Sequence, residues 1–250
     1  MLTAYINQTR RLLANPVAPT PLYATADLTA YINYARGQIA GEAQCIRRLG
    51  ALTTTIGQRA YNFSAITITG AAAAGIDSAI HVRGIQYQIA SGQQRVTARP
   101  WEWFDLYALN NPVYTPGSPA TWAQLGQGSA PGATGAAGGG SFYIDPVPDN
   151  AYALVLDCVC YPLALVADGD PEALPYLWTD AVPFFAAYWA FLSSQGGARQ
   201  ADADRMFGYY QEFMKRARTA ANPAVLNYQY AQANDPVQML KLGIRPGGGA

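Results

Sequence analysis

The sequence predicts an α+β fold, in which one helix pair lies near each end of the chain and a β-rich domain is inserted between the two pairs. Three observations predict it. Apolar residues recur every three or four positions in the first 50 residues, the same spacing returns after residue 179, and β-branched, alternating patterns fill the stretch between them. The predicted division is 1–50 for the first helix pair, 51–166 for the β domain, 167–221 for the second pair and 222–250 for an extended C-terminal arm.

The string LTAYIN occurs twice in the N-terminal region, at 2–7 and at 28–33. A solenoid built on this period needs at least three units, so a third copy should follow near residue 54. The sequence there reads TTTIGQRAYNFSAI, which is a strand-and-turn pattern. The repeat therefore indicates two helices with the same first turn.

These two helices are expected over 2–14 and 28–49. Asp27 stands where an N-cap residue is preferred, and Gly50 where a left-handed residue would end the second helix. The proline-rich string ANPVAPTP between them ends the first helix.

The β domain is expected to begin with strands over about 51–98, with a bulge where the alternation slips at Gly84 and a turn at the SGQ string. Pro100 suits the first turn of a short aromatic helix that carries Trp101 and Trp103. Two further strands are expected in SFYIDPVPDNAYALVLDCVCYPLAL, with PVPDN as the turn between them.

A glycine-rich stretch over 126–141, GQGSAPGATGAAGGGS, has almost no side chain that can pack, so we predict a mobile loop. It lacks the Gly-Lys-Ser/Thr ending of a phosphate-binding loop.

The second helix pair is predicted over 180–195 and 199–221. The first of these helices, capped by Thr179 or Asp180, is apolar on nearly every side, which is typical of a buried helix. The second has one apolar stripe and ends in a basic cluster, which suits the helix dipole.

The last 29 residues lack a sustained helical or strand pattern and could reach roughly 90 Å if fully extended. They hold too many apolar side chains for a solvating tail. We therefore expect this arm to become ordered on a partner.

Composition narrows the possible functions. Charged residues make up only 13% of the chain and hydrophobic residues 50%, so we expect something besides the core of one monomer to cover the excess of apolar residues. The net charge is zero, which gives no global field for holding nucleic acid. The chain has no apolar run long enough for a membrane span and no recognisable signal peptide.

The sequence offers little catalytic or metal-binding chemistry. His81 is the single histidine, so a histidine-rich metal site is excluded, and no nucleophile elbow is present. Cys158 and Cys160 share one face of a predicted strand, and with Cys45 they are expected to be reduced, buried thiols. We expect no enzyme activity, no catalytic residues, no metal and no cofactor. The carboxylates concentrate in turns, at Asp145, Asp149, Asp157, Asp168, Asp170 and Glu172.

Four stretches together resemble a known family. ARGQIAGEAQCIRRLGALTTTIGQRAYNFS, RPWEWFDLYALNNPVYTPGSPATWAQLGQG, FYIDPVPDNAYALVLDCVCYP and PYLWTDAVPFFAAYWAFLSSQ with RQADADRMFGYYQEFMKRAR resemble the head-to-tail adaptor, or head-completion, proteins of tailed phages. The layout is similar to the tail tubular protein A type of short-tailed phages, although this β insertion is longer than in minimal adaptors.

The resemblance implies that the first two and the last two helices form an antiparallel four-helix bundle. It also implies a structural virion protein, made in the host cytoplasm, that forms a ring of twelve copies at the head-tail interface. It implies the portal protein and a tail nozzle or tube protein as partners, and transient, non-specific contact with genomic DNA in the channel. The portal-binding residues are expected in the C-terminal arm: Tyr228, Tyr230, Val237, Met239, Leu240, Leu242, Ile244 and Arg245. The loop that faces the tail or the channel is expected at Gly126, Gly128, Gly132, Gly135, Gly138, Gly139 and Gly140.

Two other interpretations stay open at this point. Trp101, Trp103 and Trp122, with the carboxylates, are also compatible with a tail component that binds or hydrolyses host-surface carbohydrate. A virion scaffold without portal contact is the third possibility.

Overall fold

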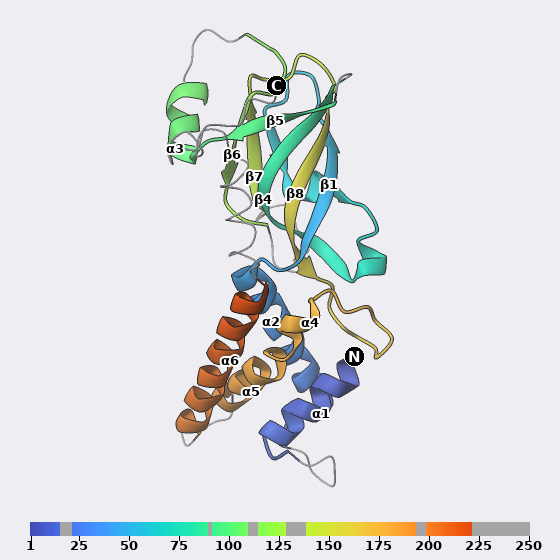
Figure 1. Cartoon of the computed structure of the whole chain (residues 1–250), viewed down its shortest axis with the longest axis vertical. Coiled ribbons are helices and arrows are strands. Elements are labelled where there is room, and N and C mark those ends of the chain that lie inside the picture. Colours follow the sequence, from blue (N-terminus) through green and yellow to red (C-terminus); the bar gives the residue numbers. More distant parts are fainter. Residues whose placement is uncertain (16–21, 90–91, 110–114, 129–138, 194–198, 222–250) are drawn as a thin grey trace, which may run out of the picture.

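The computed structural model describes residues 1–15, 22–89, 92–109, 115–128, 139–193 and 199–221, and everything below concerns these residues. Helices gather at one end of the molecule and a strongly curled sheet at the other (Figure 1). The chain passes from the helices into the sheet and back again, so helices distant in sequence lie side by side. The predicted α+β fold is confirmed: the N- and C-terminal helices pack together, and the sheet is inserted between them in the sequence.

The helical part is organised around α5, which contacts α1, α2 and α6. Burial explains the composition of α5: its apolar residues face neighbours on several sides, and the Phe184 ring stacks on Phe213 of α6 at 4.9 Å. The helices are α1 (Leu2–Leu12), α2 (Thr25–Ala43), the short α4 (Tyr176–Thr179), α5 (Val182–Ser193) and α6 (Gln200–Ala221).

The predicted bounds of the second helix are wrong at both ends. Its N-cap is Ala24, with Asp27 inside the first turn, and it ends at Ala43 where Gln44 takes the left-handed conformation at φ 50°. Gly50 lies in strand β1 (Arg47–Thr53), which pairs along its whole length with β8 (Ala153–Pro162). Long-range strand pairing thus overrides a helical spacing that continued by coincidence past the helix end.

Two other expected helix starts also differ. Thr179 does not cap the buried helix, since it ends α4 and its hydroxyl donates to the Tyr176 carbonyl oxygen at 2.8 Å. Pro100 takes the N-cap position before α3 (Trp101–Trp103), which continues as the wide helical turn η3 (Phe104–Leu109).

The sheet has eight strands in the order β2-β7-β6-β5-β4-β8-β1-β3. All pairs are antiparallel except β5 with β6, so the sheet is mixed. The remaining strands are β2 (Ala60–Asn62), β3 (Thr67–Ile68), β4 (Ile76–Ile89), β5 (Gly92–Ala98), β6 (Thr121–Leu125) and β7 (Ser141–Asp145).

Two details of the sheet bear on the predictions. The register between β4 and β8 shifts between Val82 and Gly84, so the expected bulge is confirmed. The two strands around PVPDN are present, but β7 and β8 do not pair with each other because β6, β5 and β4 lie between them.

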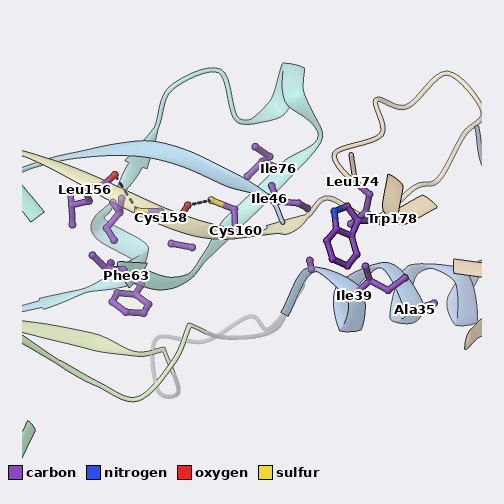
Figure 2. Close-up of a cluster of buried hydrophobic side chains, with 14 of the residues drawn as sticks. Ala35, Ile39, Ile46, Phe63, Ile76, Leu156, Cys158, Cys160, Leu174 and Trp178 are labelled. Atoms are coloured by element: carbon purple, nitrogen blue, oxygen red, sulfur yellow. Dashed lines mark hydrogen bonds between the residues drawn. The ribbon is translucent and has the colours of Figure 1, made fainter. Parts of the chain in front are cut away.

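One hydrophobic core joins the two parts. Figure 2 shows Ile39 of α2 and Trp178 of α4 on one side of the junction and Cys160 of β8 on the other, and all three are buried. The Cys158 and Cys160 thiols lie on the same face of β8, as expected, and burial raises their pKa to about 12 and about 11. Both thiols are unpaired, and they serve as small apolar side chains.

Candidate interaction surfaces

A buried ion pair holds the helical part together at the junction. Arg36 of α2 is fully buried, and its guanidinium binds Glu172 in the segment after β8, with an Nη2 to Oε1 distance of 2.8 Å. The guanidinium also donates to the Leu163 carbonyl oxygen at 2.8 Å and to Asn33 Oδ1 at 3.2 Å. Burial raises the pKa of Tyr5 of α1, whose hydroxyl donates to Glu172 at 3.0 Å. The network is fully partnered, so its role is structural.

The pattern of α2 contained a signal for this network that the sequence reasoning missed. Arg36 lies four residues after Ile32 and three before Ile39, on the buried stripe of the helix. A lone charged residue on an apolar stripe needs a buried partner. The partner, Glu172, lies 136 positions away and had no local signal.

A groove of about 660 Å³ runs between α2 and the sheet. Gly37 and Gly41, one turn apart on α2, leave open space along one wall, since a Cβ at either position would meet nothing within 4 Å. Tyr34, which is half exposed, stands beside them and packs edge-on against Trp189 at 5.0 Å between ring centroids. The opposite wall carries His81, whose pKa is lowered mainly by burial.

The glycine-rich loop is described only at its two ends. Gly126 has φ 75°, and the Gly128 amide donates to the Ile80 carbonyl oxygen at 2.8 Å. A Cβ at Gly128 would lie 2.0 Å from the Ala79 carbonyl oxygen, so the backbone approach requires glycine. On the other side Gly139 is exposed and Gly140 accepts a hydrogen bond from the Phe63 amide at 3.0 Å. Gly132, Gly135 and Gly138 lie outside the described residues.

The described chain ends at Ala221, at the last residue of α6. Near this end, the Tyr210 hydroxyl donates to Glu42 of α2 at 2.8 Å, and Arg218 donates to the Glu42 carbonyl oxygen at 3.4 Å. The C-terminal end of α6 therefore lies close to the end of α2 and to the junction with the sheet. The eight residues expected to bind the portal lie outside the described residues.

The tryptophans and carboxylates behind the carbohydrate interpretation are not gathered into one open site. Trp122 is buried at 4% exposure, whereas Trp101 and Trp103 are half-buried around Phe104. Each carboxylate has a partner within the chain: Asp145 with Arg59, Asp149 with the Tyr152 hydroxyl, Asp157 with Arg47, Asp168 with the N-terminal amine, Asp170 with the Val166 and Ala167 amides, and Glu172 with Arg36.

Within the described residues no group of three or more His, Cys, Asp and Glu side chains is placed to hold a metal ion. The helices among them are all too short or too polar to cross a membrane.

Comparison with known proteins places the chain in a family. The family model described as SU10 adaptor protein matches residues 2–238, which includes both helix pairs, the whole sheet and the first part of the C-terminal arm. A search of curated proteins found no match. The resemblance inferred from the sequence is thereby confirmed, and the chain belongs to the SU10 adaptor protein family of phage head-tail adaptors.

Proposed function

We propose that this protein forms a closed ring, of twelve copies as the resemblance implies, between the portal and the tail nozzle or tube of a phage particle, with DNA passing through the centre. The observation that carries the proposal is the adaptor-family match over residues 2–238. The composition supports it, because a ring subunit hides two of its sides against neighbours and tolerates a low charged fraction of 13%.

The C-terminal arm is proposed to bind the portal. The family match continues past α6 into this arm and stops at residue 238, so Tyr228, Tyr230 and Val237 lie inside the matched region. Beyond the match, the apolar run that includes Met239, Leu240 and Leu242 is suited to packing on another protein.

The glycine-rich loop is proposed to face the tail protein or the channel. Its two described ends are held by hydrogen bonds, from the Gly128 amide to the Ile80 carbonyl oxygen of β4 and from the Phe63 amide to the Gly140 carbonyl oxygen, and Gln127 beside the first of them lines the groove with α2. DNA contact there would be transient, because a chain of zero net charge releases few counterions from the phosphates.

Binding to the portal is the first test. The purified protein is mixed with the portal ring of the same phage, mass is followed by light scattering and symmetry by negative-stain imaging. We expect a portal-sized complex with added, rotationally symmetric density. A folded protein that fails to associate with an intact portal would contradict the proposal.

Two truncations locate the contact. Removal of 222–250 should abolish portal binding while the circular dichroism spectrum of the helices and sheet persists. Removal of 239–250 alone tests the part outside the family match, and an intermediate affinity is expected. Unchanged binding after removal of 222–250 would overturn the docking role of the arm.

A further inference from the structure

Three arginines lie together on the outer face of the sheet, outside the hydrophobic core. Arg47 of β1, Arg83 of β4 and Arg95 of β5 line one shallow hollow of about 270 Å³. Only one carboxylate lines it, Asp157, which already pairs with Arg47. We call this surface the arginine face.

The arginine face also has an apolar centre. Leu49 is 65% exposed, and it lies opposite Asp157 in the β1–β8 register, two pairs away from the half-buried Val155 opposite Ala51. Gly84 of the bulge adds no side chain, and a Cβ there would meet nothing within 4 Å, so the hollow is open to an incoming side chain.

A second surface has the opposite character. The helical segment Trp101–Leu109 is anchored on β6 through Phe104 and Ala108, which pack around Ala123. Its outer side presents Leu106 and Tyr107, 61% and 58% exposed. We call this outer side the aromatic ridge.

The aromatic ridge is acidic as well as apolar. Glu102 and Asp105 are exposed on the same segment. The Trp103 ring lies 5.5 Å from Tyr107 and under the Arg99 guanidinium at 4.9 Å, which fixes the aromatic group in place. Beside its exposed apolar side chains the ridge thus carries two carboxylates and the Arg99 guanidinium, whereas the arginine face carries three guanidinium groups and one carboxylate.

The two surfaces lie apart within one chain. The ridge is on β6 and the arginine face spans β5, β4, β8 and β1, and Figure 1 shows α3 and β1 on opposite sides of the sheet. Complementary patches on opposite sides of one subunit produce a heterologous contact that repeats from copy to copy. Opposite charges favour this pairing and set its register.

We propose that the aromatic ridge of one copy docks on the arginine face of the next copy, with Leu106 and Tyr107 against Leu49 and with Glu102 and Asp105 facing Arg83 and Arg95. The proposal deepens the proposed ring by naming its contact on the sheet. It rests on the proposed function only because the ring is what brings the copies together. The contact itself can also be measured in the free protein.

Thiol cross-linking tests the contact directly. The double variant Leu49→Cys/Leu106→Cys is treated with a short bismaleimide, alone at high concentration and after mixing with the portal ring, and is run on a denaturing gel. All variants are made in a Cys45→Ser background, because Cys45, expected to be buried, is only partly buried. We expect a ladder of covalent multimers from the double variant, and monomers from each single variant and from the Cys45→Ser parent, whose Cys158 and Cys160 are buried.

Four outcomes separate this proposal from the adaptor role. A ladder supports the contact whether or not the portal is bound, and a ladder without portal binding contradicts only the adaptor role. Portal binding without a ladder overturns the contact and leaves the adaptor role standing. If neither is seen, both are wrong.

Charge reversal provides the second measurement. Arg83→Glu/Arg95→Glu on the face, or Glu102→Arg/Asp105→Arg on the ridge, should each lower the ladder yield by about tenfold, and the two together should restore it. The matched control is Arg205→Glu on the exposed side of α6, which should leave the ladder yield unchanged. Two results would overturn the proposal: a ladder yield that the charge reversals leave unchanged, or a combined variant whose yield is as low as that of either reversal alone. Binding of duplex DNA to the arginine face, with no ladder formed, would overturn it as well.

Discussion

The Arg36–Glu172 pair of the helical part and the Arg47–Asp157 pair of the sheet lie in opposite environments. In the helical part the principal ion pair is internal: Arg36 is fully buried and Glu172 is 11% exposed. On the sheet the Arg47–Asp157 pair lies on the outer face, with side chains 52% and 30% exposed, while the interior is apolar and holds two thiols. The difference teaches that the buried pair fixes how α2 meets the segment after β8, whereas the exposed pair on the sheet leaves its charged groups open to contact with other molecules.

The largest expected effect is on the buried pair. Arg36→Met leaves Glu172 buried without its partner and should lower the free energy of unfolding by about 3–5 kcal/mol. The matched control, Arg47→Met on the exposed pair, should cost at most about 1 kcal/mol. Urea denaturation followed by circular dichroism measures both.

The double variant Arg36→Met/Glu172→Leu sharpens this result. Removing both charges should recover most of the lost stability, because no unpaired buried charge remains. Equal losses at Arg36 and Arg47 would contradict the contrast between the two regions.

The apolar interior of the sheet comes next. Leu156→Ala in β8 removes a fully buried side chain and should cost about 2–5 kcal/mol. Leu49→Ala, on the exposed side of neighbouring β1, should stay within about 0.5 kcal/mol. Thermal denaturation of both variants measures the difference, and comparable losses would mean that the exposed face carries stability as well.

Substitution of two glycines by alanine should change the free energy of unfolding in opposite directions. Gly128→Ala forces a Cβ against the Ala79 carbonyl oxygen and should destabilise the protein by about 1–3 kcal/mol. Gly37→Ala on α2 enters open space in a helix and should stabilise it by about 0.5–1 kcal/mol. A shared sign in urea denaturation would contradict the assigned backbone roles.

The smallest expected effect is the pH dependence of stability that comes from Asp170. Hydrogen bonds from the Ala167 and Val166 amides hold the pKa of Asp170 below its usual range. The carboxylate therefore stabilises the fold at pH values above its unfolded pKa of about 4, and this contribution disappears as the pH falls through the lower folded value. The Tm difference between wild type and Asp170→Asn should be small at pH 7 and vanish in strong acid, whereas a persistent difference would show that the ionised form is not responsible.

The sequence predicted the architecture well where the signal was local. Helical spacing identified both helix pairs, the all-apolar composition identified α5 as buried, and the slip in alternation located the bulge at Gly84. It failed at the end of α2, because Ile46 and Leu49 continue the helical spacing after Ala43 while β1 is fixed by pairing with a strand about 110 residues away.

The surfaces were harder to predict. The ends of the glycine-rich loop were recognisable, but the need for glycine at Gly128 depends on β4, which approaches it only in the folded chain. The Arg36–Glu172 pair and the arginine face also join residues from distant elements, so no window of sequence contains them. The roles of the C-terminal arm stay predictions, since that segment lies outside the described residues.

The core shared across the junction has a mechanical consequence. Two chain crossings run beside each other there, at the start of β1 and the end of β8, and Ile46, Cys160 and Trp178 fill the space around them. A subunit joined by a single linker would bend under load, whereas two parallel crossings around a packed core resist bending and twisting. A push on the sheet end is therefore delivered to the helices as a displacement of the whole subunit.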